Sequence, residues 1–376
     1  MFACQSRSLP LVSVDSLDTS AAKKNRVCLI VPGLQEPEFS RALTHKSAIL
    51  KVITRAERVA SSIVTAEQAM LGALGHPGIE ATAVPAASCN FVDDTGEQLW
   101  PISMVDPVHV RAEPDHALVH SAHALNLCAP EAEALLDTLN QHFKEDAIEF
   151  VSGNDHRWYI TGVDGSGLRT QPLTRVADRN MTGFIDAGQQ PQAWRQLITE
   201  VQMILHDHPV NLARAEKNLL PINSVWCWGG QAPPAEVDIG DQRIFADDAF
   251  TRGLARLSAF KTFPVSEAAA LTGKRAQVVC LRSLETTLMT QTVDMSDESF
   301  QRAELPAGLQ QDLDCLERLL TLALRGLLMG RVGQIELIPC NGHLYRMRRM
   351  DLLRFWSAPW SRRRLALTDS VADPSA

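Results

Sequence analysis

One chain segment reads as a buried strand that runs straight into two glycines, and it constrains the fold most strongly. Residues 225–228 are Val-Trp-Cys-Trp, Gly229 and Gly230 follow, and prolines at positions 233 and 234 stop the strand from continuing. Each tryptophan can bury a large apolar area. In α/β proteins, a strand that ends in glycines can bring backbone N–H groups up to a phosphate or carboxylate. A tight turn after a buried strand is the alternative interpretation.

The length and charge of the chain narrow the class of protein. With 376 residues, the chain is long enough for two domains or for one domain with a large insertion. Its net charge of -8 argues against an electrostatic nucleic-acid binder, which usually presents a basic face. Arginines gather near the C-terminus, where a solvated rim is the simpler interpretation. They are Arg346, Arg348, Arg349, Arg354 and Arg362 to Arg364. We therefore expect no nucleic-acid partner.

The cysteines and the apolar stretches predict a cytoplasmic protein. The eight cysteines are scattered singly, with no Cys-x-x-Cys pair, which is typical of reduced, buried thiols. No stretch reaches the roughly 18 apolar residues that a membrane helix needs. The N-terminus lacks a basic start followed by an apolar core, so we predict no secretion signal and no membrane partner.

Alternating strand and helix patterns predict an α/β fold with a mainly parallel sheet, interrupted by an α+β insertion. The predicted organisation is a disordered tail over residues 1–25, core over 26–90, insertion over 91–219, core again over 220–355 and a C-terminal tail over 356–376. Strands are expected at residues 27–31, 118–123, 148–151, 158–163, 225–228, 277–281, 334–338 and 343–348. Helices are expected at residues 48–64, 67–74, 130–143, 192–205, 249–260, 266–271 and 309–329, and a turn at residues 93–96.

Four runs of residues resemble a known family. They are Asp106-Pro-Val-His109-Val-Arg111, Arg157-Trp-Tyr159, residues 194–205, and Asn223 through to the glycine pair. Together these runs resemble proteobacterial proteins described as phosphoglycerate mutase-like, or as RpfE-type regulatory proteins. Those proteins in turn are similar to archaeal-type cofactor-independent phosphoglycerate mutases of the alkaline phosphatase superfamily. The resemblance covers roughly residues 26 to 230, and it implies an alkaline phosphatase-like core with a substrate-binding insertion.

The chain departs from that family where the catalytic metals would lie. In the mutases the first strand opens onto a metal-binding aspartate followed by glycine, whereas here it opens onto Pro32-Gly33, and the nearest acid is Glu36. Thr44 and Ser47 lie in the region of the nucleophile but lack its flanking residues. After Gly230 neither an Asp-x-x-x-His set nor a Gly-Asp-His run occurs, and His343 is the only histidine. Since phosphoryl transfer with two metals needs clustered carboxylates and histidines, we predict no metal site and assign no cofactor. Mn²⁺ or Mg²⁺ is expected only if the protein is active.

Asp106, His109 and Arg111 form the best candidate for an anion site. In a strand, Arg111 and His109 point to the same face and offer adjacent donors. A structural ion pair is the competing interpretation, and Asp106 before a proline can be a turn former. Asn211 and Arg214, at i and i+3, are similarly poised if their segment is helical.

Asn223, Gly229 and Gly230 complete the predicted set of anion-binding residues. The histidine groups His206 with His208, and His116 with His120 and His123, are disfavoured as metal sites. The first pair lies at a helix end, and the second group is expected on a strand, where its spacing does not bring the rings together.

Two functions follow from these observations. The first is a catalytically degenerate phosphoglycerate mutase-like protein that binds a small phosphorylated acid or a protein partner in a regulatory role. The alternative is an active metal-dependent phosphoglycerate mutase or phosphatase that acts on small phosphorylated acids.

Overall fold

The computed structural model describes residues 25–34, 47–113, 117–121, 125–165, 167–177, 192–270, 275–282 and 307–353. The predicted C-terminal tail and all but the last residue of the predicted N-terminal tail lie outside this part of the chain. The same holds for Glu36, Thr44, His116 and His123, which the sequence singled out.

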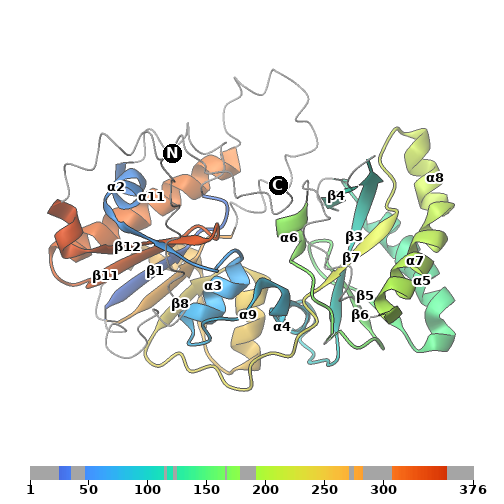
Figure 1. The fold of residues 1–376 in the computed structure, drawn as a ribbon, viewed down its shortest axis with the longest axis horizontal. Helices are drawn as coiled ribbons and strands as arrows, with labels where there is room; N and C mark the ends of the chain where they lie inside the picture. Colours follow the sequence, from blue (N-terminus) through green and yellow to red (C-terminus); the bar gives the residue numbers. More distant parts are fainter. Residues whose placement is uncertain are drawn as a thin grey trace, which may run out of the picture.

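A mainly parallel sheet forms the first layer of the fold (Figure 1). Its strand order is β2-β12-β11-β1-β10-β8-β9. The strands are β1 (Arg26–Ile30), β2 (Glu57–Ala60), β8 (Arg243–Ala246), β9 (Thr262–Phe263), β10 (Gln277–Cys280), β11 (Gln334–Ile338) and β12 (His343–Arg348). The pairs from β11 through β1, β10 and β8 to β9 are parallel, and β12 and β2 add antiparallel pairs at the other edge. This arrangement confirms the predicted α/β class.

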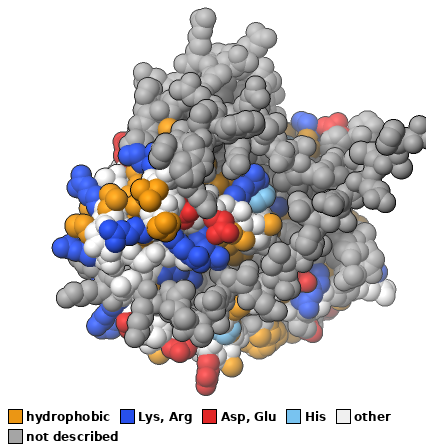
Figure 2. Space-filling view, turned by 60° about the vertical axis from the view of Figure 1, so that its left-hand side comes forward, with side chains coloured by type: hydrophobic (Ala, Val, Ile, Leu, Met, Phe, Trp, Pro, Cys, Tyr) orange, Lys and Arg blue, Asp and Glu red, His pale blue; other side chains and the backbone are white. Residues whose placement is uncertain are grey.

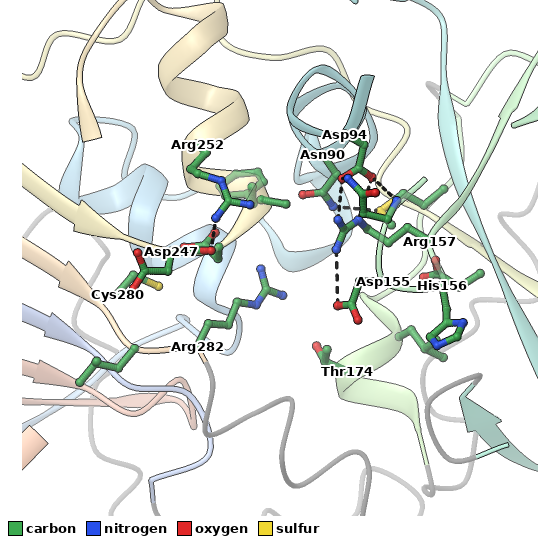
Figure 3. A pocket seen from close by; sticks show the side chains of 18 of the residues that line it. Asn90, Asp94, Asp155, His156, Arg157, Thr174, Asp247, Arg252, Cys280 and Arg282 are labelled. Atoms are coloured by element: carbon green, nitrogen blue, oxygen red, sulfur yellow. Dashed lines mark hydrogen bonds and ion pairs between the residues drawn. The ribbon is translucent and has the colours of Figure 1, made fainter. Parts of the chain in front are cut away.

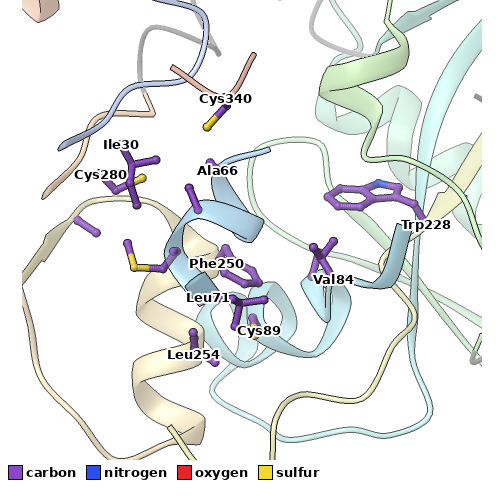
Figure 4. Close-up of a cluster of buried hydrophobic side chains, with 14 of the residues drawn as sticks. Ile30, Ala66, Leu71, Val84, Cys89, Trp228, Phe250, Leu254, Cys280 and Cys340 are labelled. Atoms are coloured by element: carbon purple, nitrogen blue, oxygen red, sulfur yellow. The ribbon is translucent and has the colours of Figure 1, made fainter. Parts of the chain in front are cut away.

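Helices cover both faces of this sheet because the central strands are apolar on both sides. In β1, Val27 and Leu29 face one cluster with α2 (Ser47–Arg55) and α11 (Ala307–Leu328). Cys28 and Ile30 face the opposite cluster, which contains α3 (Ala66–Ala73), α4 (Ala86–Thr95) and α9 (Ala249–Leu257). Figure 4 shows this second cluster, in which Phe250 and Leu254 of α9 lie near Cys89 of α4. The cluster continues beyond the parallel sheet to Trp228.

A second, antiparallel sheet lies beside the first (Figure 1). Its strands are β3 (Ser103–Ala112), β4 (Ala117–Ser121), β5 (Glu149–Ser152), β6 (Trp158–Thr161) and β7 (Ser224–Trp228). β3 is its longest strand and pairs with β7 along one edge and with β4 and β6 along the other. α5 (Ala129–His142) and α7 (Gln192–His206) cover one face, and α8 (Pro209–Glu216) follows α7. Short helical turns complete the described chain: η3 (Ala81–Ala83), η4 (Phe143–Asp146), α6 (Leu173–Val176), η6 (Val265–Ala270) and η9 (Arg349–Leu353).

The strand at residues 225–228 forms as predicted, but its assignment to the parallel core was wrong. β7 pairs antiparallel with β3, so that Trp228 lies opposite Met104 and Ser224 opposite Val108. Trp226 and Trp228 pack into the cluster around α4, while Val225 and Cys227 pack against the side of α5 and α7. A strand buried on both faces is apolar throughout, so it resembles a strand of a parallel sheet in sequence.

Two further predictions need correction. The helix expected over residues 48–64 ends at Arg55, and the following residues form the edge strand β2. The turn expected at residues 93–96 is the last turn of α4, which ends at Gly96 in a left-handed conformation with φ of 81°. Glycine adopts this conformation without the strain that a side chain would bring. None of the helices that the structure describes is both long and apolar enough to cross a bilayer.

Candidate functional site

A cavity of about 540 Å³ opens at the carboxyl ends of β8 and β10, facing the second sheet (Figure 3). The core contributes Asp247 and Asp248, which follow β8, and Arg282, which follows β10. α4 contributes Asn90 and Asp94. The other side is formed by residues 154–157 of the β5–β6 hairpin and by Leu173 and Thr174 of α6. In open α/β sheets, ligands bind outside the carboxyl ends of the strands, so this cavity is the candidate site.

Arg157 reaches the cavity from the β5–β6 hairpin and is held there by Asp94. Its Nε and Nη2 donate to the two carboxylate oxygens of Asp94 over 3.1 and 2.6 Å. The Tyr159 hydroxyl donates to the same carboxylate over 2.6 Å, and Asn154 donates through its backbone and side chain. Burial opposes the charge on Arg157, but the hydrogen bonds with Asp94 outweigh it and raise the pKa of the guanidinium. Burial, reinforced by Asp94, raises the pKa of Tyr159 far above its usual range, so the phenol stays protonated and donates.

The neighbouring Asp93 holds a second arginine of the cavity. Nη2 of Arg252, on α9, lies 2.7 Å from Asp93, and Arg256 lies 3.6 Å from the same carboxylate. Hydrogen bonding to Asp93, opposed by partial burial, raises the pKa of Arg252. The adjacent aspartates at the end of α4 therefore pair with different parts of the fold: Asp93 with arginines of α9, and Asp94 with the β5–β6 hairpin.

Arg282 projects into the cavity between these two arginine groups (Figure 3). Its side chain is 19% exposed, and its Nη2 lies 2.5 Å from Oε1 of Glu67, a carboxylate of α3 that is 1% exposed. A fixed cationic fork of this kind is suited to carboxylate or phosphoryl oxygens.

Several carboxylates of the cavity are already engaged by protein donors. Asp106 accepts a 2.6 Å hydrogen bond from Trp228 Nε1, and Asp248 caps α9 through a 2.8 Å bond from the Thr251 amide. Asp247 accepts from the Val265 amide at 3.2 Å. Among the residues that the structure describes, no three His, Cys, Asp or Glu side chains are grouped so that they could hold a metal ion. The described donor set does not fit a metal centre, and we derive no step through one.

Cys280 at the end of β10 lines the cavity as a buried thiol. It is buried, and burial raises the pKa of its thiol well above the usual value. The thiolate is the reactive form of cysteine. Cys280 therefore contributes to the cavity as a protonated side chain of its wall.

The structure separates the residues of the predicted Asp106–Arg111 site. Asp106 lines the cavity. His109 is buried further along β3, with Nδ1 2.9 Å from the Pro221 carbonyl oxygen, and burial lowers its pKa. Arg111 is half-exposed and forms a 2.8 Å ion pair with Glu113. His109 and Arg111 are not among the residues that line the cavity. Their ligand-binding role stays a prediction.

Asn211 and Arg214 lie on one turn of α8, as the helical spacing predicts, and make structural contacts. Asn211 donates to the carbonyls of Leu205 and Ile222 over 2.7 and 2.8 Å. Arg214 is 1% exposed and lies 2.6 Å from Glu131 of α5. These bonds tie α8 to its surroundings, away from the cavity lining. Anion binding by this pair stays a prediction.

Asn223, Gly229 and Gly230 serve close packing around β7. Asn223 bonds to both backbone groups of Val110, at 2.8 and 2.9 Å. Gly229 has a φ of 69°, and its carbonyl accepts a 3.0 Å bond from the Ala87 amide of α4. A side chain at Gly230 would collide with the Ser103 hydroxyl. Both glycines thus lie at points of close packing just after the strand, and phosphate binding at them stays a prediction.

The sequence did not single out Arg282, Glu67, Asp247 or Asp248. A signal existed for Arg282, since it follows a strand that was predicted over residues 277–281. The carboxyl end of a parallel strand is where an α/β protein places its ligand. The aspartates follow β8, a strand that the apolar pattern of the sequence did not predict.

Comparison with known proteins links the chain to one enzyme group. No family model matches the sequence. The 2,3-bisphosphoglycerate-independent phosphoglycerate mutase of Methanosarcina mazei is 30% identical over 122 residues, which are 32% of this chain and 31% of that enzyme. The 2,3-bisphosphoglycerate-independent phosphoglycerate mutase 2 of Methanothermobacter thermautotrophicus is 28% identical over 108 residues, 28% of this chain and 27% of the enzyme. The match thus spans less than a third of the length of these curated relatives. Over this stretch, the chain is similar to 2,3-bisphosphoglycerate-independent phosphoglycerate mutases.

Two solved structures are also similar to this chain. A cofactor-independent phosphoglycerate mutase from Thermoplasma acidophilum has a TM-score of 0.36 at 14% identity, over 86% of this chain and 90% of that one. A protein from Pyrococcus horikoshii has a TM-score of 0.44 at 10% identity, over 87% of each chain.

Proposed function

We propose that the cavity binds a small phosphorylated acid and that the chain is a phosphoglycerate mutase-like protein that binds this ligand without transferring its phosphoryl group. The observation that carries the proposal is that Arg157 and Arg282 line one cavity from different sheets, Arg157 from the β5–β6 hairpin and Arg282 from the end of β10. Guanidinium groups pair with carboxylate and phosphoryl oxygens through two parallel hydrogen bonds. A phosphorylated acid carries both groups and can present one to each arginine.

The engaged aspartates support binding over transfer. Asp94 is paired with Arg157, Asp106 accepts from Trp228, and Asp248 caps α9. These contacts partly offset the negative charge that the aspartates bring to the cavity. They also use carboxylate oxygens that divalent metals would otherwise take as ligands. A protein that binds a ligand without converting it can still report the presence of that ligand. The proposal therefore includes a regulatory role like that of the RpfE-type proteins. A protein partner is the alternative to the small phosphorylated ligand.

The cellular location belongs to the same proposal. Five of the described cysteines are buried thiols: Cys28, Cys89, Cys227, Cys280 and Cys340. Free thiols persist in reducing compartments. We therefore place the protein in the cytoplasm.

An active metal-dependent mutase or phosphatase is the second candidate. The mutase activity of the similar archaeal enzymes favours it, and its metal would depend on cavity carboxylates such as Asp247 and Asp312, which the described residues do not group into a metal site. Hard cations such as Mg²⁺ and Mn²⁺ take carboxylate ligands.

Calorimetric titration of the purified chain with 3-phosphoglycerate, in EDTA and again with added Mn²⁺, separates the two candidates. The proposal expects binding in EDTA, no turnover with Mn²⁺ in coupled mutase and phosphatase assays, and weaker binding by Arg282→Gln. Turnover that requires Mn²⁺ would establish the enzyme. Absence of binding to 3-phosphoglycerate and 2-phosphoglycerate under both conditions would refute the anion site.

A further inference from the structure

The carboxylate of Glu67 forms an ion pair with Arg282 and is not among the residues that line the cavity. Glu67 is in the first turn of α3 and is 1% exposed. Its Oε1 lies 2.5 Å from Arg282 Nη2, and neither of its oxygens accepts a regular hydrogen bond from another described residue. Arg282 is thus the described counter-ion of this carboxylate, while the guanidinium itself reaches the cavity.

The backbone that carries Glu67 is held in place by a complete capping box. The Gln68 amide donates to Thr65 Oγ1 over 3.2 Å, and Gln68 Oε1 accepts from the Thr65 amide over 3.2 Å. The Gln68 side chain also donates to the Ile79 carbonyl over 2.9 Å. These bonds fix the first turn of α3, and with it the origin of the Glu67 side chain.

Burying such a pair does little for stability, because the desolvation of two charges offsets their attraction. The contact does have a geometric effect: it fixes one edge of a planar group whose donors lie in a rigid fork. We propose that Glu67 is a positioning residue that orients the guanidinium of Arg282 toward the ligand. This inference rests on the proposed function and assigns Glu67 a part in it.

The arrangement also implies selectivity between anions. Glu67 balances the charge of Arg282, which weakens the attraction of the arginine for anions in general. The geometry of the guanidinium donors then decides which anion binds. A planar carboxylate or a phosphoryl group offers two acceptors at the spacing of the fork, and a monatomic anion does not. We therefore expect inorganic phosphate to compete with 3-phosphoglycerate and chloride at the same ionic strength not to compete.

The first test compares ligand affinity in matched variants. Glu67→Gln keeps the size of the side chain and removes its charge, and we expect the Kd for 3-phosphoglycerate to rise about tenfold, as for the loss of one charge-assisted hydrogen bond. Glu67→Asp retains the charge and should recover part of the affinity. The control is Glu131→Gln, which breaks a similar ion pair with buried Arg214 away from the cavity. It should lower the midpoint of urea unfolding and leave the Kd unchanged.

Chemical rescue distinguishes positioning from a merely structural role. In Arg282→Ala, millimolar guanidinium ion should bind beside Glu67 and restore part of the affinity for 3-phosphoglycerate. In the double variant Arg282→Ala with Glu67→Gln, the same ion should restore nothing.

Three results would overturn the inference. They are an unchanged Kd for 3-phosphoglycerate in folded Glu67→Gln, equal rescue by guanidinium ion in Arg282→Ala and in the double variant, and chloride that competes with 3-phosphoglycerate as well as phosphate does. If Glu67→Gln does not fold, the rescue of Arg282→Ala decides alone, and lack of rescue there counts against positioning. Absence of binding by the unmodified chain has a different meaning, since it refutes the proposed function itself.

Discussion

Asp94→Asn probes the contact that links α4 to the β5–β6 hairpin. Asparagine has nearly the same shape as aspartate but carries no charge, so Arg157 would lose its bidentate partner. The Asp94 side chain is 1% exposed and that of Arg157 is 19% exposed. Five hydrogen bonds from Asn154, Arg157 and Tyr159 converge on this one carboxylate.

The expected cost follows from the burial of the pair. Removing one partner of a fully buried ion pair costs about 3–5 kcal/mol. Arg157 keeps some contact with water and retains Asp155 at 3.6 Å, so we expect the smaller loss of about 2–3 kcal/mol. Asparagine can still accept one hydrogen bond from the Tyr159 hydroxyl, which also limits the loss.

Equilibrium urea unfolding, followed by tryptophan fluorescence, measures this cost. Asp155→Asn is the control, because Asp155 is 56% exposed and its surface ion pair should contribute no more than about 1 kcal/mol. Asp94→Asn should also weaken ligand binding, since Asp94 holds the Nε–Nη2 edge of the Arg157 guanidinium. A loss below about 1 kcal/mol for Asp94→Asn would refute the reasoning, because the carboxylate would then not be the main partner of Arg157.

Three further predictions concern stability. Burial lowers the pKa of His208, whose Nδ1 accepts from the Val210 amide and caps α8, so the unfolded chain binds this proton first and stability falls as the pH drops below about 6.5. His208→Asn keeps a capping acceptor, and urea midpoints from pH 7 to pH 5 should show a shallower decline; an identical decline would contradict the assignment. Gly253→Ala places a methyl group against the Cys89 backbone, where α4 and α9 touch. It should lower the free energy of unfolding by more than about 2 kcal/mol, measured by thermal unfolding. A neutral effect would mean that the two helices can move apart. Trp228→Phe deprives Asp106 of its 2.6 Å donor and should cost about 2–4 kcal/mol in urea, and a cost below about 1 kcal/mol would show that water replaces the indole.

The sequence predicts the elements of this fold better than their assembly. Apolar periodicity located β1, β10, α5, α7 and α9, because each buries one face or both faces against a neighbour. It could not decide which sheet contains β7, since a strand covered on both faces looks alike in a parallel and an antiparallel sheet.

The candidate site was harder to predict for a related reason. Asp94 and Arg157 are 63 positions apart, and Glu67 and Arg282 are separated by the whole insertion. No local spacing reports such pairs. Asp94 meets Arg157 where the β5–β6 hairpin contacts the end of α4, and Glu67 meets Arg282 because β10 returns to the parallel sheet. Asp106 was predicted from a resemblance and does line the cavity, whereas Arg111, five residues further along β3, does not.

The apolar cluster that runs from Ile30 to Trp228 bears on how a ligand arrives. Because side chains of α4 pack against both sheets within this cluster, a hinge-like separation of the sheets would expose apolar surface to water. The cavity is consequently preorganised, and little free energy is lost in shaping it around a guest. Association should then proceed in a single kinetic phase whose rate rises linearly with ligand concentration, without the saturation that a slow opening step imposes.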